Sequence, residues 1–366
     1  MDVSWEAAAA WRAGRHRLDA RAPHEEALGV ASVLCGLHAQ VLSSAELTLW
    51  ARVADLRRDD VSRWLWQDKA LVKQWAMRGT LHLLPAAELG LWHGALGTYA
   101  HWLKPSWFKG FGTSREEMEA LIAAVSAALA GRCLTREQLA GELGEERLTE
   151  SWGAYLKPVA FRGQLCFGPD AGRNVTFTRP DTWLGAPVEP WDGEAALDEV
   201  ARRFLRAYAP ATADDFRRWW AISEPQARRR LQRLDVAEVS VGGERAYVLA
   251  QDAEALAAAE PDDTVRLLPG FDPWVIGATR HSDRLMPDPA FRDRVHRPQG
   301  WVSPVITAGG RIVGTWRHER RGATLRVALA PFGAPDDAVR AGAEAEAARL
   351  ATFLEAPERD LDWTVG

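Results

Sequence analysis

The sequence predicts an α+β protein built from three tandem winged-helix units followed by a β-rich C-terminal region. A nine-residue near-repeat, AMRGTLHLL at 76–84 and AFRGQLCFG at 160–168, places an Arg-Gly pair between an amphipathic helix and a strand-like run. A glycine just past the last helical turn adopts the left-handed conformation that ends a helix. Because a recognition helix joins its wing in this way, the two copies indicate two winged helices. A capped helix pair with a Gly-Gly hairpin predicts the third.

The first unit covers residues 1–90. Leu28, Ala31, Leu34 and Leu37 recur at helical spacing. Ser43 and Glu46 form a capping box that should open the next helix. The expected helices are therefore 3–18, 25–37, Ala45 to about Leu56, and Ala70–Met77 before the first Arg-Gly pair.

Residues 91–180 comprise a connecting segment and the second unit. A helix is expected at 115–131, and Thr135 is a suitable N-cap for a helix ending near Leu143. A further helix, Trp152–Phe161, leads into the second Arg-Gly pair. Proline and glycine are frequent at 181–193, which we interpret as a linker.

The third unit, 194–260, contains the clearest helix-turn-helix signal. A helix at 194–208 is followed by two capped helices, Thr212–Trp220 and Ser223–Leu234, joined by a very short turn. Proline in the first turn of the second helix is tolerated there. Two strands around Gly242-Gly243 would form the wing. The last region, 261–366, is strand-rich to about Phe332 and ends in a helix at 335–354.

Composition excludes several classes of protein. The 366 residues are 47% hydrophobic and 26% charged, and no apolar run is long enough for a membrane span. The N-terminus lacks a signal-peptide pattern, so a cytoplasmic location is expected. Cys35, Cys133 and Cys166 are far apart, which predicts buried thiols and neither a metal nor a cofactor. Phosphate-binding loops, dinucleotide fingerprints and nucleophile elbows are absent from the sequence.

Arginine dominates the positive charge of this chain. All but five of the 45 Lys and Arg residues are arginine, although the net charge is −5. Arginine suits phosphates and base edges, but codon bias explains the composition equally well. The densest cluster lies on the predicted recognition helix and the helix before it. The candidate DNA contacts are Arg78, Arg162, Arg217, Arg218, Arg228, Arg229, Arg230, Arg233, Arg317 and Arg320. Each could instead belong to an ordinary solvated surface.

Two short segments could carry chemistry. His38-Ala39-Gln40 lies between two predicted helices. If the chain leaves helical geometry there, the His38 and Gln40 side chains would share one side. The alternative is that both side chains merely satisfy a helix end. Asp272, in the turn-rich stretch 268–277, more readily caps a turn than catalyses a reaction.

The residues resemble the bacterial winged-helix DNA glycosylases of the AlkZ and YcaQ kind. The resemblance extends over nearly the whole chain in order. It rests on WRAGRHRL at 11–18, GLHAQ at 36–40, LWAR at 49–52, MRGTLHL at 77–83, LKP at 156–158, FRGQLCFGP at 161–169, ATADDFRRWW at 211–220 and LLPGFDPW at 267–274.

The resemblance implies a C-shaped arrangement of three winged helices and a catalytic Gln-x-Gln or Gln-x-Asp triplet in the first. Here the triplet position holds His38-Ala39-Gln40. Gln40 matches the pattern, whereas His38 replaces the first glutamine. The replacement indicates either a variant with a different adduct preference or a relative that has lost activity. We favour the variant, because an imidazole can also act as a general base near neutral pH.

The resemblance further implies excision of N7-alkylated or bulky purine adducts from double-stranded DNA by base excision repair. Self-resistance to a DNA-alkylating natural product is a related possibility. No lysine is obviously placed for Schiff-base chemistry, so a monofunctional enzyme is expected, and a monomer. The alternatives are a non-enzymatic regulator that binds DNA through its arginine-rich helix and a protein that sequesters adducts without cleaving them.

Overall fold

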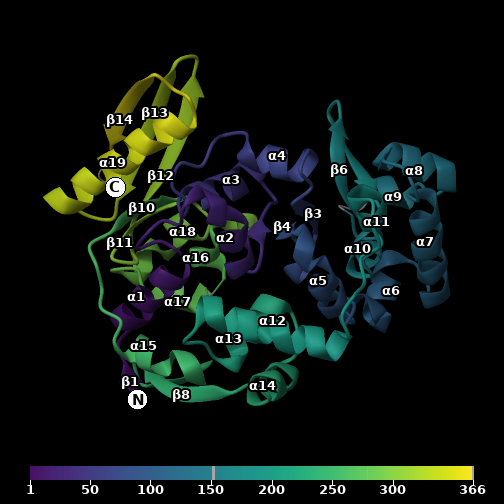
Figure 1. Ribbon diagram of the computed structural model, residues 1–366, viewed down its shortest axis with the longest axis horizontal. Coiled ribbons are helices and arrows are strands. Elements are labelled where there is room, and N and C mark those ends of the chain that lie inside the picture. Colours follow the sequence, from purple (N-terminus) through teal and green to yellow (C-terminus); the bar gives the residue numbers. More distant parts are fainter. Residues whose placement is uncertain (151–152, 278, 365–366) are drawn as a thin grey trace. The chain divides into compact units, whose positions relative to one another are not determined.

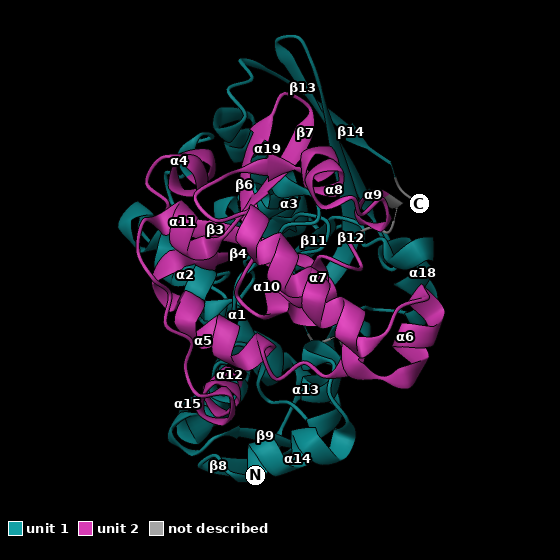
Figure 2. Ribbon diagram, turned by 90° about the vertical axis from the view of Figure 1, so that its right-hand side faces the viewer, with its two compact units in different colours: residues 1–60, 201–366 teal, residues 61–200 magenta. Residues whose placement is uncertain are grey.

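The computed structural model describes residues 1–150, 153–277 and 279–364. Helices and strands both occur throughout the chain and most strand pairs are antiparallel, which confirms the α+β class (Figure 1). The chain forms two compact units (Figure 2). Unit 1 combines residues 1–60 with 201–366, and unit 2 comprises residues 61–200. No described helix is long and apolar enough to cross a membrane.

Unit 1 begins with short elements, and several predicted boundaries are wrong. In order they are β1 (Asp2–Val3), α1 (Trp5–Arg15), η1 (His24–Glu26), α2 (Ala27–Val33), β2 (Leu37–His38) and α3 (Leu42–Trp50). The Ser43 capping box does not form. Helix α3 begins at Leu42, three residues before the expected Ala45, with Val41 at its N-cap and no side-chain cap. Burial of Leu47, Leu49 and Trp50 fixes this helix, so packing outweighs the local capping signal.

The predicted helix-turn-helix and hairpin are confirmed. Helix α12 (Gly193–Tyr208) crosses from unit 2 into unit 1 and precedes α13 (Ala213–Trp220) and α14 (Glu224–Gln232). Thr212 and Ser223 both make capping boxes. Strands β8 (Val236–Val241) and β9 (Glu244–Leu249) pair antiparallel around Gly242 and Gly243, both of which have positive φ. Strand β1 pairs with the other edge of β8.

The C-terminal region contains a five-stranded sheet. Its order is β10 (Val265–Leu268), β11 (Val305–Ala308), β12 (Arg311–Arg321), β13 (Thr324–Pro331) and β14 (Glu358–Trp363). Neighbours are antiparallel except β13 and β14, and α19 (Asp337–Phe353) lies against the sheet (Figure 1). The strand-rich region and its helix are confirmed, but β14 was not predicted. Its side chains are largely charged, and pairing with β13 defines the strand.

Short helices lie in two connections, from β9 to β10 and from β10 to β11. They are η5 (Ala250–Asp252), α15 (Ala253–Ala257), α16 (Pro273–Ile276), α17 (Thr279–Arg284), η6 (Pro289–Phe291), α18 (Arg292–Val295) and η7 (Pro298–Gly300). Each spans fewer than two helical turns. The segment between β10 and β11 therefore folds as compact turns over the sheet rather than as strands.

Unit 2 is mainly helical, with two small groups of strands. Its first half contains α4 (Asp60–Trp66), β3 (Leu71–Trp75), η2 (Met77–Gly79), β4 (Leu81–Pro85), η3 (Ala86–Glu88), α5 (Leu89–Leu96), η4 (His101–Leu103) and α6 (Pro105–Phe111). Its second half contains α7 (Arg115–Ala128), β5 (Leu134–Thr135), α8 (Arg136–Leu143), α9 (Arg147–Glu150), α10 (Lys157–Phe161), β6 (Cys166–Ala171), β7 (Asn174–Thr178) and α11 (Pro180–Leu184). Strands β5, β7 and β6 form one sheet.

The two Arg-Gly pairs occupy different structures. The second pair follows a helix and leads to β6, as predicted, but α10 begins only at Lys157, whereas the predicted helix was Trp152–Phe161; Trp152 itself lies outside the described residues. The helix predicted at Ala70–Met77 is wrong, because Leu71–Trp75 is a strand that pairs with β4. Arg78, with φ 57°, and Gly79 close this hairpin. Trp75 packs against Phe167 and Phe177, so contacts distant in sequence select the strand.

Candidate active site

The His38–Gln40 segment leaves helical geometry, as the sequence predicts. Helix α2 ends at Val33, and Cys35 (φ 61°) and Gly36 (φ 93°) then reverse the chain. His38 ends strand β2, Gln40 lies in a bend, and α3 begins at Leu42. In extended backbone, side chains two residues apart project to the same face. Strand geometry ends at His38 and Gln40 lies in the bend, so the placement of both side chains on one side stays a prediction.

The two candidate catalytic side chains have different surroundings. His38 is only 6% exposed, and its ring stacks on Phe271 with centroids 5.0 Å apart and planes 21° apart. Gln40 is exposed. The segment thus combines an imidazole held against an aromatic ring with an amide that solvent can reach.

Phe271 belongs to a turn that is held by a buried ion pair. The Asp272 carboxylate accepts a hydrogen bond of 2.8 Å from the Trp274 backbone N–H, which confirms its predicted role as a turn cap. It also accepts two hydrogen bonds, of 2.8 and 2.7 Å, from the Arg52 guanidinium. Both side chains are fully buried. Sequence reasoning missed this pairing, although both residues lie in segments that carry the family resemblance.

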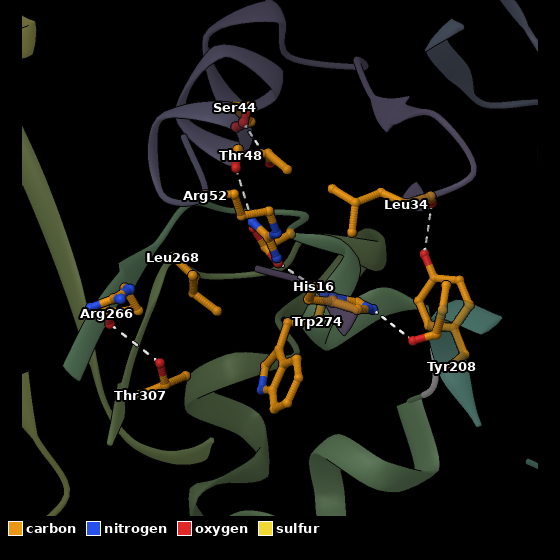
Figure 3. A network of polar contacts seen from close by, with 12 residues as sticks. His16, Leu34, Ser44, Thr48, Arg52, Tyr208, Arg266, Leu268, Trp274 and Thr307 are labelled. Atoms are coloured by element: carbon orange, nitrogen blue, oxygen red, sulfur yellow. Dashed lines mark hydrogen bonds and ion pairs between the residues drawn. The ribbon is translucent and has the colours of Figure 1, made fainter. Parts of the chain in front are cut away.

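Further polar contacts surround Arg52 and fix the neighbouring backbone (Figure 3). Arg52 donates a hydrogen bond of 3.0 Å to the Thr48 carbonyl of α3. The Tyr208 hydroxyl donates one of 3.1 Å to the Leu34 carbonyl, just before the turn that leads to His38. Burial, followed by the charges of Arg52 and Arg12, lowers the pKa of His16 well below its ordinary value. The distant Tyr208 thereby anchors the backbone just before the His38–Gln40 segment, and the Arg52–Asp272 pair ties the chain just after α3 to the turn of Phe271.

Three of the candidate arginines on helices α13 and α14 form ion pairs with acidic residues of their own helix. Arg217 and Arg218 both contact Asp214, at 2.6 Å. On α14, Arg228 contacts Glu224 at 2.7 Å. Exposed Arg229 makes no ion pair with any residue that the structure describes.

Arg230 and Arg233 lie further along the same helical segment, where Arg233 is exposed and Arg230 half-buried. Surface ion pairs of this kind contribute less than about 1 kcal/mol each. A phosphate could therefore replace the acidic partners at little cost.

The remaining candidate DNA contacts lie elsewhere. Arg317 is exposed on β12. Arg320 donates to the backbone carbonyls of Gly322, Leu354 and Glu355, so its guanidinium holds the sheet edge. In unit 2, Arg78 is exposed in the β3–β4 turn. Arg162 pairs with Glu119 at 2.6 Å and lies over the Trp102 ring.

The cysteines do not all follow the prediction. Cys35 and Cys166 are buried, and burial raises the pKa of the Cys166 thiol. Cys133 is exposed, because it lies in the loop between α7 and β5 rather than in the core. The described residues contain no cluster of His, Cys, Asp and Glu that could hold a metal ion.

Comparisons with known proteins agree over most of the chain. The family model described as "DNA glycosylase AlkZ-like" matches residues 31–353. An interstrand DNA cross-link repair glycosylase from Streptomyces sahachiroi is 39% identical over 333 residues, which cover 86% of this chain and 88% of the relative. The solved structure of Streptomyces sahachiroi DNA glycosylase AlkZ superimposes with a TM-score of 0.90 at 36% identity, covering 100% of both chains.

Proposed function

Because the chain belongs to the family of AlkZ-like DNA glycosylases, we propose that it excises N7-alkylated or bulky purine adducts as a monofunctional enzyme. The observation that carries this proposal is the non-helical His38–Gln40 segment, which holds a positioned imidazole and an accessible amide two residues apart. The relative's name supports DNA repair as the process.

The substrate itself supplies much of the chemical driving force. Alkylation at N7 makes the purine cationic, so the bond between C1′ and N9 is weakened and the departing base needs little protonation. When that bond breaks, its electron pair passes to the purine and neutralises the positive charge. Positive charge develops on the sugar, and the oxygen of a water molecule forms the new bond to C1′.

His38 and Gln40 act on the attacking water. The Gln40 side-chain carbonyl accepts a hydrogen bond from the water and orients it toward C1′. Neutral His38 accepts the proton that the water loses, a step that positioned general bases accelerate by about 10²- to 10⁴-fold. The Phe271 ring limits rotation of the imidazole, since it covers one face of it.

DNA binding uses the exposed arginines. We propose that α13, α14 and the β8–β9 hairpin form a winged helix whose second helix faces the duplex. The helix pair, its short connection and the following hairpin support this assignment. A second winged helix would comprise α8, α10 and the β6–β7 hairpin. Arg229 and Arg233 are exposed and suited to contact phosphates directly.

The first test uses a duplex with one defined bulky N7-guanine adduct. After incubation with the protein, hot alkali should cleave the adducted strand at the lesion, and untreated samples should remain intact. His38→Ala and Gln40→Ala should abolish base release and retain duplex affinity. Strand cleavage without alkali, or a covalent product trapped by borohydride, would contradict the monofunctional mechanism.

Two outcomes would support the other functions. Tight binding of the adduct without base release by the wild-type protein would indicate a sequestering protein. A preference for one sequence in undamaged DNA would indicate a regulator. Cross-linked duplex is the second substrate to assay, since the relative's name refers to interstrand cross-links.

A further inference from the structure

An aromatic pair connects His38 to the protein surface. One face of Phe271 stacks on the His38 ring, and Trp301 makes an edge contact with Phe271, with centroids 5.0 Å apart and planes 78° apart. Only the Phe271 ring therefore separates the imidazole from the indole. The three residues come from β2, the turn before α16, and the end of η7.

Trp301 is unusually exposed for its size. Its exposed fraction of 54% is higher than that of any other large apolar side chain in the described ranges. Tryptophan normally gives up most of its surface on folding, because its large ring contributes strongly to burial energy. An exposed indole that is one aromatic ring away from the candidate catalytic residue His38 is therefore a candidate binding surface.

The loop that carries Trp301 is held in place by backbone contacts. His296 and Val302 form an antiparallel bridge, and the Arg297 N–H donates to the Trp301 carbonyl at 2.8 Å. Gln299 (φ 61°) and Gly300 (φ 76°) close the turn. The backbone that carries the indole is thus held in place, and its edge contact with Phe271 orients the ring.

The turn that carries Phe271 packs directly against this loop. A Cβ atom at Gly270 would lie 2.8 Å from the Val302 carbonyl oxygen, so the two backbones approach as only glycine permits. Phe271 itself has a left-handed backbone conformation (φ 61°), which a non-glycine residue adopts only where its surroundings require it. The buried Arg52–Asp272 pair supplies that requirement at the next residue.

We propose that Trp301 is a specificity-determining residue that stacks on the planar aromatic part of an N7 adduct, and that Phe271 is a positioning residue for His38. The inference deepens the proposed glycosylase function and rests on it. A small N7 substituent would not reach the indole, whereas a substituent with its own ring system would extend toward it. Flat aromatic surfaces stack favourably and with little dependence on their exact chemistry.

The two roles predict different losses on two substrates. The probes are duplexes with N7-methylguanine or N7-benzylguanine at one position, assayed under single turnover. Trp301→Ala should lower excision of benzylguanine about tenfold, the effect of losing one stacking contact, and leave methylguanine unchanged. Trp301→Phe should retain most of the activity on benzylguanine. Trp191→Ala is the matched control, because Trp191 is also a highly exposed tryptophan, at 51%, and belongs to unit 2, whereas His38, Phe271 and Trp301 belong to unit 1.

Phe271→Leu should act on both substrates alike. We expect its maximal single-turnover rate to fall about 10- to 100-fold, while the half-saturating protein concentration stays unchanged, because misplacing a catalytic group slows chemistry. Phe271→Tyr keeps a ring against His38 and should restore the rate, which a purely structural loss would not predict.

The results separate the inference from the function on which it rests. Failure of the wild-type protein to excise either base would overturn the glycosylase proposal. If the wild type excises both, equal losses in Trp301→Ala on the two substrates, or none, would overturn the role of Trp301 alone. An unchanged maximal rate in Phe271→Leu would overturn the role of Phe271.

Discussion

The same side chain, arginine, has opposite surroundings in two regions of unit 1. Arg52 is fully buried and makes two hydrogen bonds to the Asp272 carboxylate. On α14, Arg228 is 59% exposed and paired with Glu224, one helical turn earlier. Burial removes the guanidinium from water, so its partner must be present and well aligned. An exposed guanidinium remains hydrated and can exchange partners.

This difference separates residues that shape the site from residues that can bind DNA. Arg52 and Asp272 hold the turn that places Phe271 on His38. Arg228 and Arg229 of α14 are exposed, and under the proposed function they would offer charge to a phosphate backbone. The arginines of this chain therefore have two kinds of role, and burial distinguishes those that stabilise the fold from those that are accessible to a ligand.

The largest expected effect is on stability, from the buried pair. Arg52→Ala should lower the free energy of unfolding by about 3–5 kcal/mol, because Asp272 would remain buried without its partner. Urea denaturation measures the change. The double variant Arg52→Met/Asp272→Asn should recover much of the loss, since it leaves no isolated charge. A loss below 1 kcal/mol in Arg52→Ala would contradict the structural role of the pair.

A second effect concerns the buried histidines His93 and His16, whose pKa values are lowered mainly by burial. Burial lowers the pKa of His93 to about 4, and the pKa of His16 is also lowered. Between pH 6.5 and 4 the unfolded chain binds more protons at His93 than the folded protein does. Stability is therefore retained above this range and falls as the pH decreases through it. The loss from His93 alone is about 3 kcal/mol.

Denaturation of His93→Gln across the same pH range checks this effect. The variant should be less stable at neutral pH, because His93 donates a hydrogen bond of 3.0 Å to the Gln74 side chain. Its stability should also vary less with pH than that of the wild type, while the contribution of His16 remains. Parallel curves for the two proteins would show that His93 does not bind the extra proton on unfolding.

The smallest effect on stability is expected at the exposed arginines. Arg229→Ala should change the free energy of unfolding by less than about 0.5 kcal/mol. Its effect should appear instead in duplex affinity, where the slope of log K against log salt should become shallower by about 0.9 for one lost phosphate contact. Glu224→Gln, which frees Arg228 from its partner, should raise affinity slightly. An unchanged salt slope in Arg229→Ala would remove that residue from the DNA-binding surface.

Local signals predicted the helix-turn-helix region well and the Arg-Gly repeat only in part. Thr212 and Ser223 form capping boxes that need no distant contact, so their helices could be read from the sequence. Strand β3 depends on pairing with β4 and on packing of Trp75 against residues about a hundred positions away. A near-repeat in sequence therefore accompanies a hairpin in one copy and a helix end in the other.

The candidate site shows the same limit. The departure from helical geometry at His38–Gln40 could be predicted, because local signals indicated a new helix shortly after it. Helix α3 does begin there, at Leu42, although the Ser43 capping box does not form. The stacking of Phe271, the bidentate contact of Arg52 and the position of Trp301 could not, since each joins segments far apart in the chain. The cap at Asp272 was predicted, but its buried partner was not. Spacing in sequence contains no information about such pairs.

The most direct test measures base release and duplex affinity on the same two variants. Single-turnover release from an N7-adducted duplex at saturating protein should fall at least about 100-fold in His38→Ala, with the dissociation constant nearly unchanged. In Arg229→Ala the saturated rate should remain and the affinity should fall in a salt-dependent way. A His38→Ala variant that releases the base at the wild-type rate would contradict the account, because the 38–40 segment would then have no part in the chemistry.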